Sequence, residues 1–164
     1  MLLTRHFTTP PTNGRIAMSI EQIQSLIPHR SPMLLIDEIT SLAGDNIVCQ
    51  KTFHADEFFF QGHYPNQPIV PGIILCEAAM QAGACLLSTK IAEDKTDELA
   101  AKVPVATRIN NVKFKHMVKP DDTIELTITL TDRVSTAFFL EAKVMVSGKL
   151  ATRFDFACTL ADAQ

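Results

Sequence analysis

The sequence predicts an α+β fold in which an antiparallel sheet of about six strands wraps around one long buried helix. After residue 120, apolar and polar residues alternate with the two-residue period of strands that bury one face. Residues 72–87 form an almost wholly apolar run that is too long for a strand. The length of 164 residues fits a single domain, which we expect to span residues 19–164.

Residues 1–18 are predicted to be a disordered tail, and a short amphipathic helix follows them. The tail has no continuous apolar stretch of the kind found in secretory signals. Ser19 and Gln22 form a capping-box pattern, and apolar residues then recur at helical spacing until Pro28. The helix should therefore occupy residues 20–27.

A hairpin and an irregular loop are predicted next. Residues 33–42 and 46–54 are rich in β-branched side chains, and the turn-forming residues 43–45 separate them. The segment 55–71 carries three prolines and a glycine, which favour a loop.

The apolar helix should begin directly after Pro71, a residue that the start of a helix accepts. It falls short of the roughly 18 uninterrupted apolar residues of a membrane span and contains a carboxylate, so no membrane is expected. The acidic stretch 93–98 is interpreted as a solvated connection. Four strands should complete the sheet, at residues 103–117, 123–131, 138–146 and 154–160.

Charge and cysteine content narrow the function classes. Fifteen Lys and Arg residues against eighteen Asp and Glu residues give a net charge of -3, so a nucleic-acid partner is not expected. The four cysteines lie apart in apolar surroundings without a CxxC pair. We expect reduced core residues and a cytoplasmic protein; these cysteines are Cys49, Cys76, Cys85 and Cys158.

Glu77 is the chemical anomaly of the apolar helix. An ionised carboxylate is costly in an apolar interior, so this group must be paired, neutralised or kept for a purpose. A neutral carboxyl can donate a proton, and Gln81, one helical turn further on, could orient it. The pattern leaves open that Glu77 instead reaches a surface or caps a buried polar network.

His63 and Gly72 supply the other parts of a candidate site. His63 lies in a proline-rich loop just before the helix, and imidazole is a base suited to neutral pH. By itself, a loop histidine is more often a surface residue. Gly72 would let a substrate carbonyl approach its N–H at the helix start, as an oxyanion hole requires.

Together these residues suit removal of a proton beside a thioester carbonyl, with loss of a β-hydroxyl as water. A metal site is a weaker alternative, because its candidate ligands match no known spacing; they are His54, Asp56, Glu57 and His63.

Several segments carry a family resemblance. The segment GHYPNQPIVPGIILCEAAMQAG resembles the active-site segment of the FabZ-like (3R)-hydroxyacyl-acyl-carrier-protein dehydratases of type II fatty acid synthesis, which have the hotdog fold. Supporting segments are LIPHRSPMLLIDEI, FFFQGHYP and NVKFKHMVKPDDTIELTITL, so the resemblance spans roughly residues 19–160.

The resemblance implies roles for individual residues. His63 matches the catalytic base and Glu77, fourteen positions later, the catalytic acid. Gly72 and Gln81 match substrate-binding positions. No metal or organic cofactor is implied. The family loop usually reads His-Phe-Pro-Gly-His-Pro, whereas this chain has Tyr64, Asn66 and Gln67. We expect Asn66 to tolerate a left-handed backbone that the glycine could supply.

The resemblance also implies partners. The substrate thioester would arrive on an acyl carrier protein, and the site would lie at a homodimer interface, with His63 of one subunit facing Glu77 of the other; three dimers can form a hexamer. An acidic carrier needs a basic patch, for which the candidates are Lys113, Lys115, Lys119 and Arg153. We expect Lys113 and Lys115 to share one strand face. Two alternatives stay open: a hotdog acyl thioesterase and a non-catalytic acyl-binding subunit.

Overall fold

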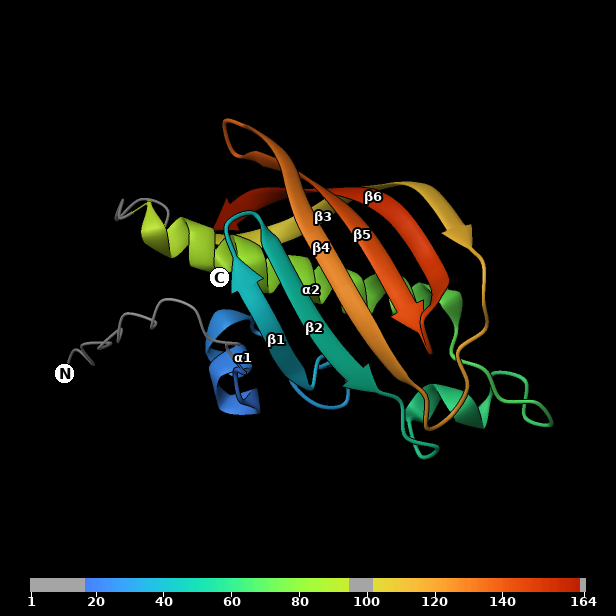
Figure 1. Ribbon diagram of the computed structural model, residues 1–164. Coiled ribbons are helices and arrows are strands. Elements are labelled where there is room, and N and C mark those ends of the chain that lie inside the picture. The colour runs from blue at the N-terminus through green and yellow to red at the C-terminus, as the bar shows by residue number, and fades with distance from the viewer. Residues whose placement is uncertain (1–16, 95–101, 163–164) are drawn as a thin grey trace.

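The computed structural model describes residues 17–94 and 102–162, and it has a six-stranded antiparallel sheet curved around one long helix (Figure 1). The strands lie in the order β1 (Glu38–Ala43), β2 (Asn46–Thr52), β4 (Thr123–Val134), β5 (Ala137–Val146), β6 (Lys149–Asp162) and β3 (Lys102–Phe114). The helices are α1 (Ile20–Leu26), the short 3-10 helix η1 (Phe58–Gln61) and α2 (Gly72–Glu93). The predicted α+β architecture is confirmed.

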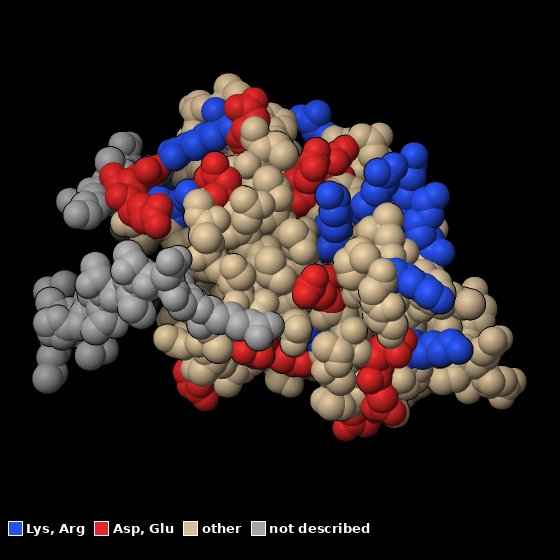
Figure 2. Space-filling model, viewed as in Figure 1, with Lys and Arg blue, Asp and Glu red and all other residues tan. Residues whose placement is uncertain are grey.

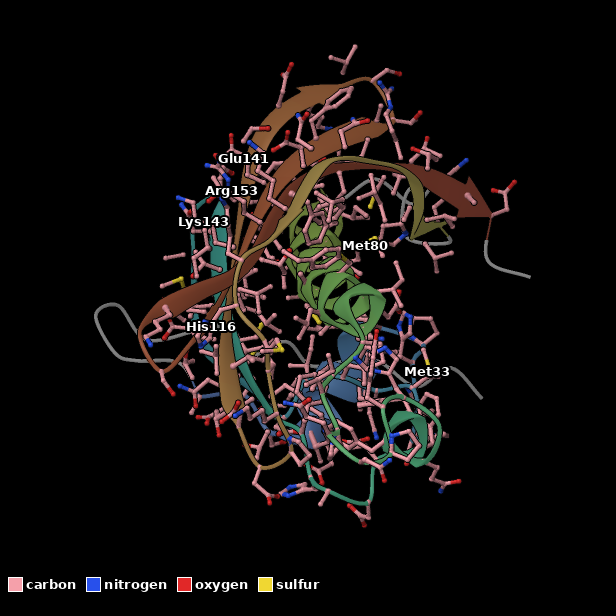
Figure 3. The ribbon with its side chains drawn as sticks, turned by 90° about the vertical axis from the view of Figure 1, so that its right-hand side faces the viewer. Met33, Met80, His116, Glu141, Lys143 and Arg153 are labelled. Atoms are coloured by element: carbon pink, nitrogen blue, oxygen red, sulfur yellow. The ribbon has the colours of Figure 1, made fainter. Side chains whose placement is uncertain are left out.

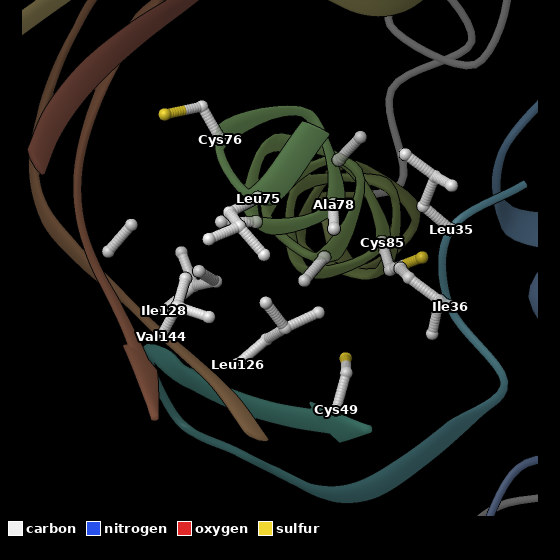
Figure 4. Packing of buried hydrophobic residues seen from close by; sticks show 14 of the residues in the cluster. Leu35, Ile36, Cys49, Leu75, Cys76, Ala78, Cys85, Leu126, Ile128 and Val144 are labelled. Atoms are coloured by element: carbon white, nitrogen blue, oxygen red, sulfur yellow. The ribbon is translucent and has the colours of Figure 1, made fainter. Parts of the chain in front are cut away.

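The core lies between α2 and the concave face of the sheet. Leu75 and Ala78 of the helix face Leu126, Ile128 and neighbouring strand residues, all fully or almost fully buried (Figure 4). The alternation that predicted β4 and β5 recurs as alternating burial along both strands. Packing is tight at one further point. A Cβ added to Gly83 of α2 would lie 2.6 Å from the ring of Phe156 in β6.

The apolar character of α2 follows from this central position. By length and composition the helix could cross a membrane, contrary to the expectation that the run is too short. More than half of its most apolar window is buried inside the protein. Packing against the sheet accounts for a hydropathy that the sequence alone leaves ambiguous.

The predicted hairpin is confirmed, but its first strand starts late. β1 begins at Glu38 rather than at residue 33, because the preceding segment crosses beside α2 and gives its backbone groups to a side chain. β2 ends at Thr52 and β3 ends at Phe114, each shorter at its C-terminal end than predicted. The loop 55–71 is irregular as expected, apart from η1.

The ends of the helices also bear on the predictions. Ser19 and Gln22 form the predicted capping box, which starts α1. α2 runs to Glu93, six residues beyond the predicted end. Most of the predicted tail and most of the acidic connection lie outside the described residues, although Met18 is described and donates its N–H to the Ile39 carbonyl at 3.1 Å.

Candidate active site

His63 is held by backbone groups of its own loop. Its N–H bonds to the Phe59 carbonyl of η1 at 3.1 Å, and its ring Nδ1 lies 2.9 Å from the Ile69 carbonyl. A carbonyl only accepts hydrogen bonds, so Nδ1 carries the hydrogen in the neutral ring. The lone pair is therefore on Nε2. The loop fixes a tautomer that can accept a proton at Nε2.

The left-handed residue of this loop is Tyr64, at φ 55°, and not Asn66 as expected. A bulky residue seldom adopts this conformation, so the surrounding loop must hold it. The Tyr64 carbonyl accepts from Gln67 N–H at 2.8 Å, which closes a tight turn. The Tyr64 ring then stands edge-on to the His63 imidazole, with centroids 4.7 Å apart. Asn66 and Gln67 thus form the exposed tip of a turn beside His63.

Glu77 lies one turn before Gln81 on α2, and the glutamine is the better buried of the two. Gln81 is 1% exposed, and all its polar atoms are used. Its Oε1 accepts from Leu35 N–H at 2.8 Å, while Nε2 donates to the Met33 carbonyl at 2.7 Å and to Glu77 Oε1 at 2.9 Å. The expected orienting contact between Gln81 and Glu77 is therefore present.

This network settles which oxygen of Glu77 can carry a proton. Leu35 N–H is only a donor and the Met33 carbonyl only an acceptor, so the Gln81 amide cannot be turned over. Its NH₂ group must face Glu77 Oε1, which acts as the acceptor. Hydrogen bonds among the described residues do not engage Oε2. A proton on Glu77 therefore belongs on Oε2, the free oxygen.

The surroundings of Glu77 differ from the expected apolar interior. Its side chain is 28% exposed, because it projects from a flank of α2 that the sheet does not cover. The sequence reasoning missed His29, whose Nε2 lies 3.6 Å from Glu77 Oε1. The available signal was its place in the segment LIPHRSPMLLIDEI, which also supplies Met33 and Leu35. Both His29 and Glu77 are half-buried, so the carboxyl is not closed to ligands.

Gly72 begins α2 with its N–H free. Ile74 and Leu75 N–H both bond to the Pro71 carbonyl, and the hydrogen bonds of the described residues leave Gly72 N–H unused. Glycine also lets the ring of Phe114, the last residue of β3, pack closely here, because an added Cβ would lie 2.6 Å from that ring. Phe114 itself is 57% exposed, so it covers the helix start only in part.

Within the described residues, no hydrogen bond or ion pair joins His63 to Glu77. His63 is on the loop before α2, and Glu77 is on the helix flank (Figure 3 looks along this end of the molecule). Met33 and Met80 lie on the side of α2 away from the outer surface of the sheet. Ile73, one turn before Glu77, is 63% exposed. Near the start of α2, the flank that carries Glu77 is therefore only partly covered in a single chain.

The structure shows the state of the cysteines and bears on the alternative of a metal site. All four cysteines are free and buried, as predicted. Burial raises the pKa of Cys76 to about 11, of Cys85 to about 12 and of Cys158 to about 11, so these thiols stay protonated. In residues 17–94 and 102–162, no group of three or more His, Cys, Asp or Glu side chains could hold a metal ion.

A basic row crosses the outer face of the sheet. Arg153 of β6 pairs directly with Lys113 of β3 on one side and Lys143 of β5 on the other. Figure 2 shows Lys and Arg side chains gathered at the right of this face, and Figure 3 places Arg153 and Lys143 on the outside of the sheet. The three cations line a hollow of about 300 Å³ together with Glu141 and Asp155.

The structure brings two of the predicted patch residues together and contradicts the strand face expected for another. Lys113 and Arg153 are neighbours, but Lys115 lies beyond the end of β3 and does not share a strand face with Lys113. The sequence reasoning missed Lys143, since strand pairing cannot be deduced from a single strand. Lys119 lies in the turn before β4, where its N–H bonds to Asp122 at 2.8 Å.

Comparisons with known proteins converge on one family. The model of the FabA-like domain matches residues 27–155. A protein of Oenococcus oeni named 3-hydroxyacyl-acyl-carrier-protein dehydratase FabZ is 39% identical over 139 residues, which is 84% of this chain and 96% of the relative. Proteins of the same name from Clostridium perfringens and Streptococcus pyogenes are 36% and 37% identical, over 82% and 86% of this chain and 92% and 99% of the relatives.

Solved structures agree on the fold. The dehydratase heterocomplex ApeI:P from Xenorhabdus doucetiae matches with a TM-score of 0.72 at 15% identity, over 85% of this chain and 91% of that one. The phenylacetic acid degradation protein PaaI from Thermus thermophilus matches with a TM-score of 0.57 at 17% identity, over 77% and 93%. At such identities the likeness concerns the fold alone.

Proposed function

Because the chain belongs to the family of FabA-like proteins, we propose that it dehydrates (3R)-hydroxyacyl thioesters on acyl carrier protein to trans-2-enoyl thioesters in fatty acid synthesis. One observation carries the chemistry: a histidine with its lone pair on Nε2 precedes, by fourteen residues, a carboxyl whose free oxygen is Oε2. The match to dehydratases over most of the chain does not favour the thioesterase or the silent subunit.

The reaction needs a base, an acid and a place for charge. The substrate carbonyl accepts a hydrogen bond from Gly72 N–H, where the free amides of the helix start stabilise the developing enolate. His63 Nε2 takes the α-proton, and the electron pair of the broken C–H bond forms the new double bond. Glu77 Oε2 protonates the β-hydroxyl, which leaves as water. His63 then returns its proton to Glu77, so the protein is unchanged after turnover. No metal or organic cofactor enters these steps.

We propose that a second copy of the chain completes the site. β3 is the sheet edge opposite β1, and its residues from Val105 to Phe114 are exposed, including apolar ones. A long exposed edge strand tends to pair with another chain. The exposed first turn of α2, where the apolar side chain of Ile73 faces solvent, has the same need for cover. A homodimer that covers both would bring His63 of one subunit to Glu77 of the other, and trimers of dimers can follow from it.

We propose that the basic row receives the carrier protein. Lys113 pairs with Arg153, and the next pair along the two strands is Phe114 with Thr152. Phe114 in turn packs on Gly72. The row is therefore one residue along the strands from the cover of the helix start. Three cations and two carboxylates, Glu141 and Asp155, line the hollow, so its net charge is positive and an acidic partner stabilises it. The buried, unpaired cysteines suit a reducing compartment, and we place the reaction in the cytoplasm.

Hydration of a crotonyl thioester, the reverse reaction, tests the proposed function. Wild type should consume the enoyl thioester, whereas His63→Ala and Glu77→Gln should each lose about 10²–10⁴-fold in turnover. His54→Ala is the matched control, because His54 is exposed and has no side-chain contact with either residue. Free thiol release is measured in parallel. Thiol release without hydration, or mutants as active as wild type, would overturn the assignment.

A further inference from the structure

His29 faces the oxygen of Glu77 that does not carry the proton. Its Nε2 lies 3.6 Å from Oε1, the atom that already accepts from Gln81 Nε2 at 2.9 Å. At 3.6 Å the imidazole does not yet form a hydrogen bond. A small movement of either side chain would make one, because both are about one third exposed, at 32% for His29 and 28% for Glu77.

The other ring nitrogen of His29 indicates which tautomer the neutral ring adopts. Nδ1 is buried, and in the described part of the chain it has no hydrogen-bond partner. A hydrogen on Nδ1 would lie buried without an acceptor. The neutral ring therefore keeps its hydrogen on Nε2 and leaves Nδ1 as a bare lone pair.

We propose that His29 is a positioning residue for Glu77, a neutral imidazole whose Nε2–H stabilises the carboxylate left when Glu77 gives its proton to the departing hydroxyl. This inference rests on the proposed dehydratase activity. In the resting site Gln81 alone holds Oε1. After proton transfer the charged Oε1 attracts a second donor, and the 3.6 Å gap to His29 closes. When His63 returns its proton, the contact relaxes. No proton passes through His29.

The surroundings favour this role over a structural one. A buried nitrogen without a partner calls for an explanation, and functional sites often retain such a group. The hydrogen bonds between this loop and α2 run through Gln81, which bonds Leu35 and Met33, and Leu35 and Ile36 pack beside Cys85, so none of these contacts involves His29. Among the described residues, His29 is also the one titratable side chain that lies within ion-pair distance of Glu77.

Replacing His29 separates the two roles. His29→Phe keeps a ring but removes the donor, and should lower kcat by about 10–100-fold with little change in KM, because a hydrogen bond to a charged group is lost only after proton transfer. The melting temperature should not fall, since the unpartnered Nδ1 is removed as well. His29→Gln carries an N–H at about the Nε2 position and should recover most of kcat. His54→Phe is the matched control and should behave as wild type.

A double-mutant cycle completes the test. In a Glu77→Gln background no carboxylate forms, so His29→Phe should not lower the residual rate further. Wild-type kcat in His29→Phe, a rate loss that persists in full in the Glu77→Gln background, or a fall in melting temperature that accounts for the rate loss would overturn the proposal. Inactive wild type would instead refute the dehydratase activity itself, so the two failures are distinguishable.

Discussion

The two sides of α2 differ in what covers them and in what they can do. Toward the sheet, small and apolar residues such as Leu75 and Ala78 are sealed against the strands. On the opposite flank, Glu77 is half-buried beside His29, and Ile73 is exposed. One side is finished within a single chain. The other holds the candidate acid and is covered only in part near the start of the helix, whereas residues 81–87 are buried on every face. The difference teaches that a second copy of the chain, as proposed above, is needed to cover only the first turns of α2.

Truncation on the sealed side should have the largest effect on stability. Phe156→Ala removes a ring that packs against Gly83 and should lower the free energy of unfolding by about 3–5 kcal/mol. Ile73→Ala, on the open flank, should cost much less in the isolated chain. Urea unfolding over a range of protein concentrations measures both. If both variants lose the same free energy of unfolding at every concentration, the two sides of α2 do not differ in cover.

Gln81 is fully buried and also bonds Glu77 on the open flank, so replacing it should affect both stability and turnover. Gln81→Leu leaves the buried Leu35 N–H without an acceptor, which should cost about 1–3 kcal/mol, and it also frees the Glu77 carboxyl. We expect kcat to fall beyond what the loss of folded protein explains. Gln50→Leu on β2 is the control, as its side chain makes no recorded hydrogen bond. Full activity in folded Gln81→Leu would show that Glu77 needs no orientation from Gln81.

The outer basic row should matter for the carrier and not for the chemistry. Lys143→Ala and Arg153→Ala should each raise KM for a carrier-bound substrate several-fold and weaken its salt dependence, while hydration of a short synthetic thioester stays unchanged. Lys102→Ala, at the far end of β3, is the matched control. If the variants lose activity equally on both substrates, the basic row does not bind the carrier.

The buried thiols give the smallest effect, confined to alkaline pH. Burial raises the pKa of Cys85 to about 12 from the ordinary 9.0, so the folded state keeps a proton that the unfolded state loses. Stability from this thiol is complete below pH 9 and declines as the pH rises toward 12, by at most about 1.4 kcal/mol per pH unit. Thermal melts at pH 8 and pH 10 should show a smaller loss in Cys85→Ala than in wild type. An identical loss of stability in the two proteins would refute the assignment of this pH dependence to Cys85.

Much of the sheet could be predicted because alternation marks a strand directly. Residues 123–128 and 138–146 bury every second side chain, which is the period of a strand and not of a helix. The apolar run at 33–36 misled because cover beside α2 requires the same residue types as a strand. The predicted helix ends too early because the apolar run stops at residue 87, whereas Ser88 and Thr89 continue the helix and donate their hydroxyls to the carbonyls of Leu26 and Leu86.

The site could be predicted in part, for the same physical reasons. An acid in an apolar helix stands out, so Glu77 and the turn-related Gln81 were found. His29 was missed because its contact with Glu77 joins residues 48 positions apart, and no local spacing reports such a pair. Lys143 was missed likewise, since its neighbour Arg153 lies on another strand.

Mixing two inactive variants tests the central claim, that base and acid meet across two chains. His63→Ala and Glu77→Gln dimers are combined and allowed to exchange subunits, with exchange followed by native mass spectrometry. If the site is shared, each mixed dimer has one intact site, and activity should return to about a quarter of wild type. If activity stays at the level of the separate variants although mixed dimers form, His63 and Glu77 act within one chain, and the account is contradicted.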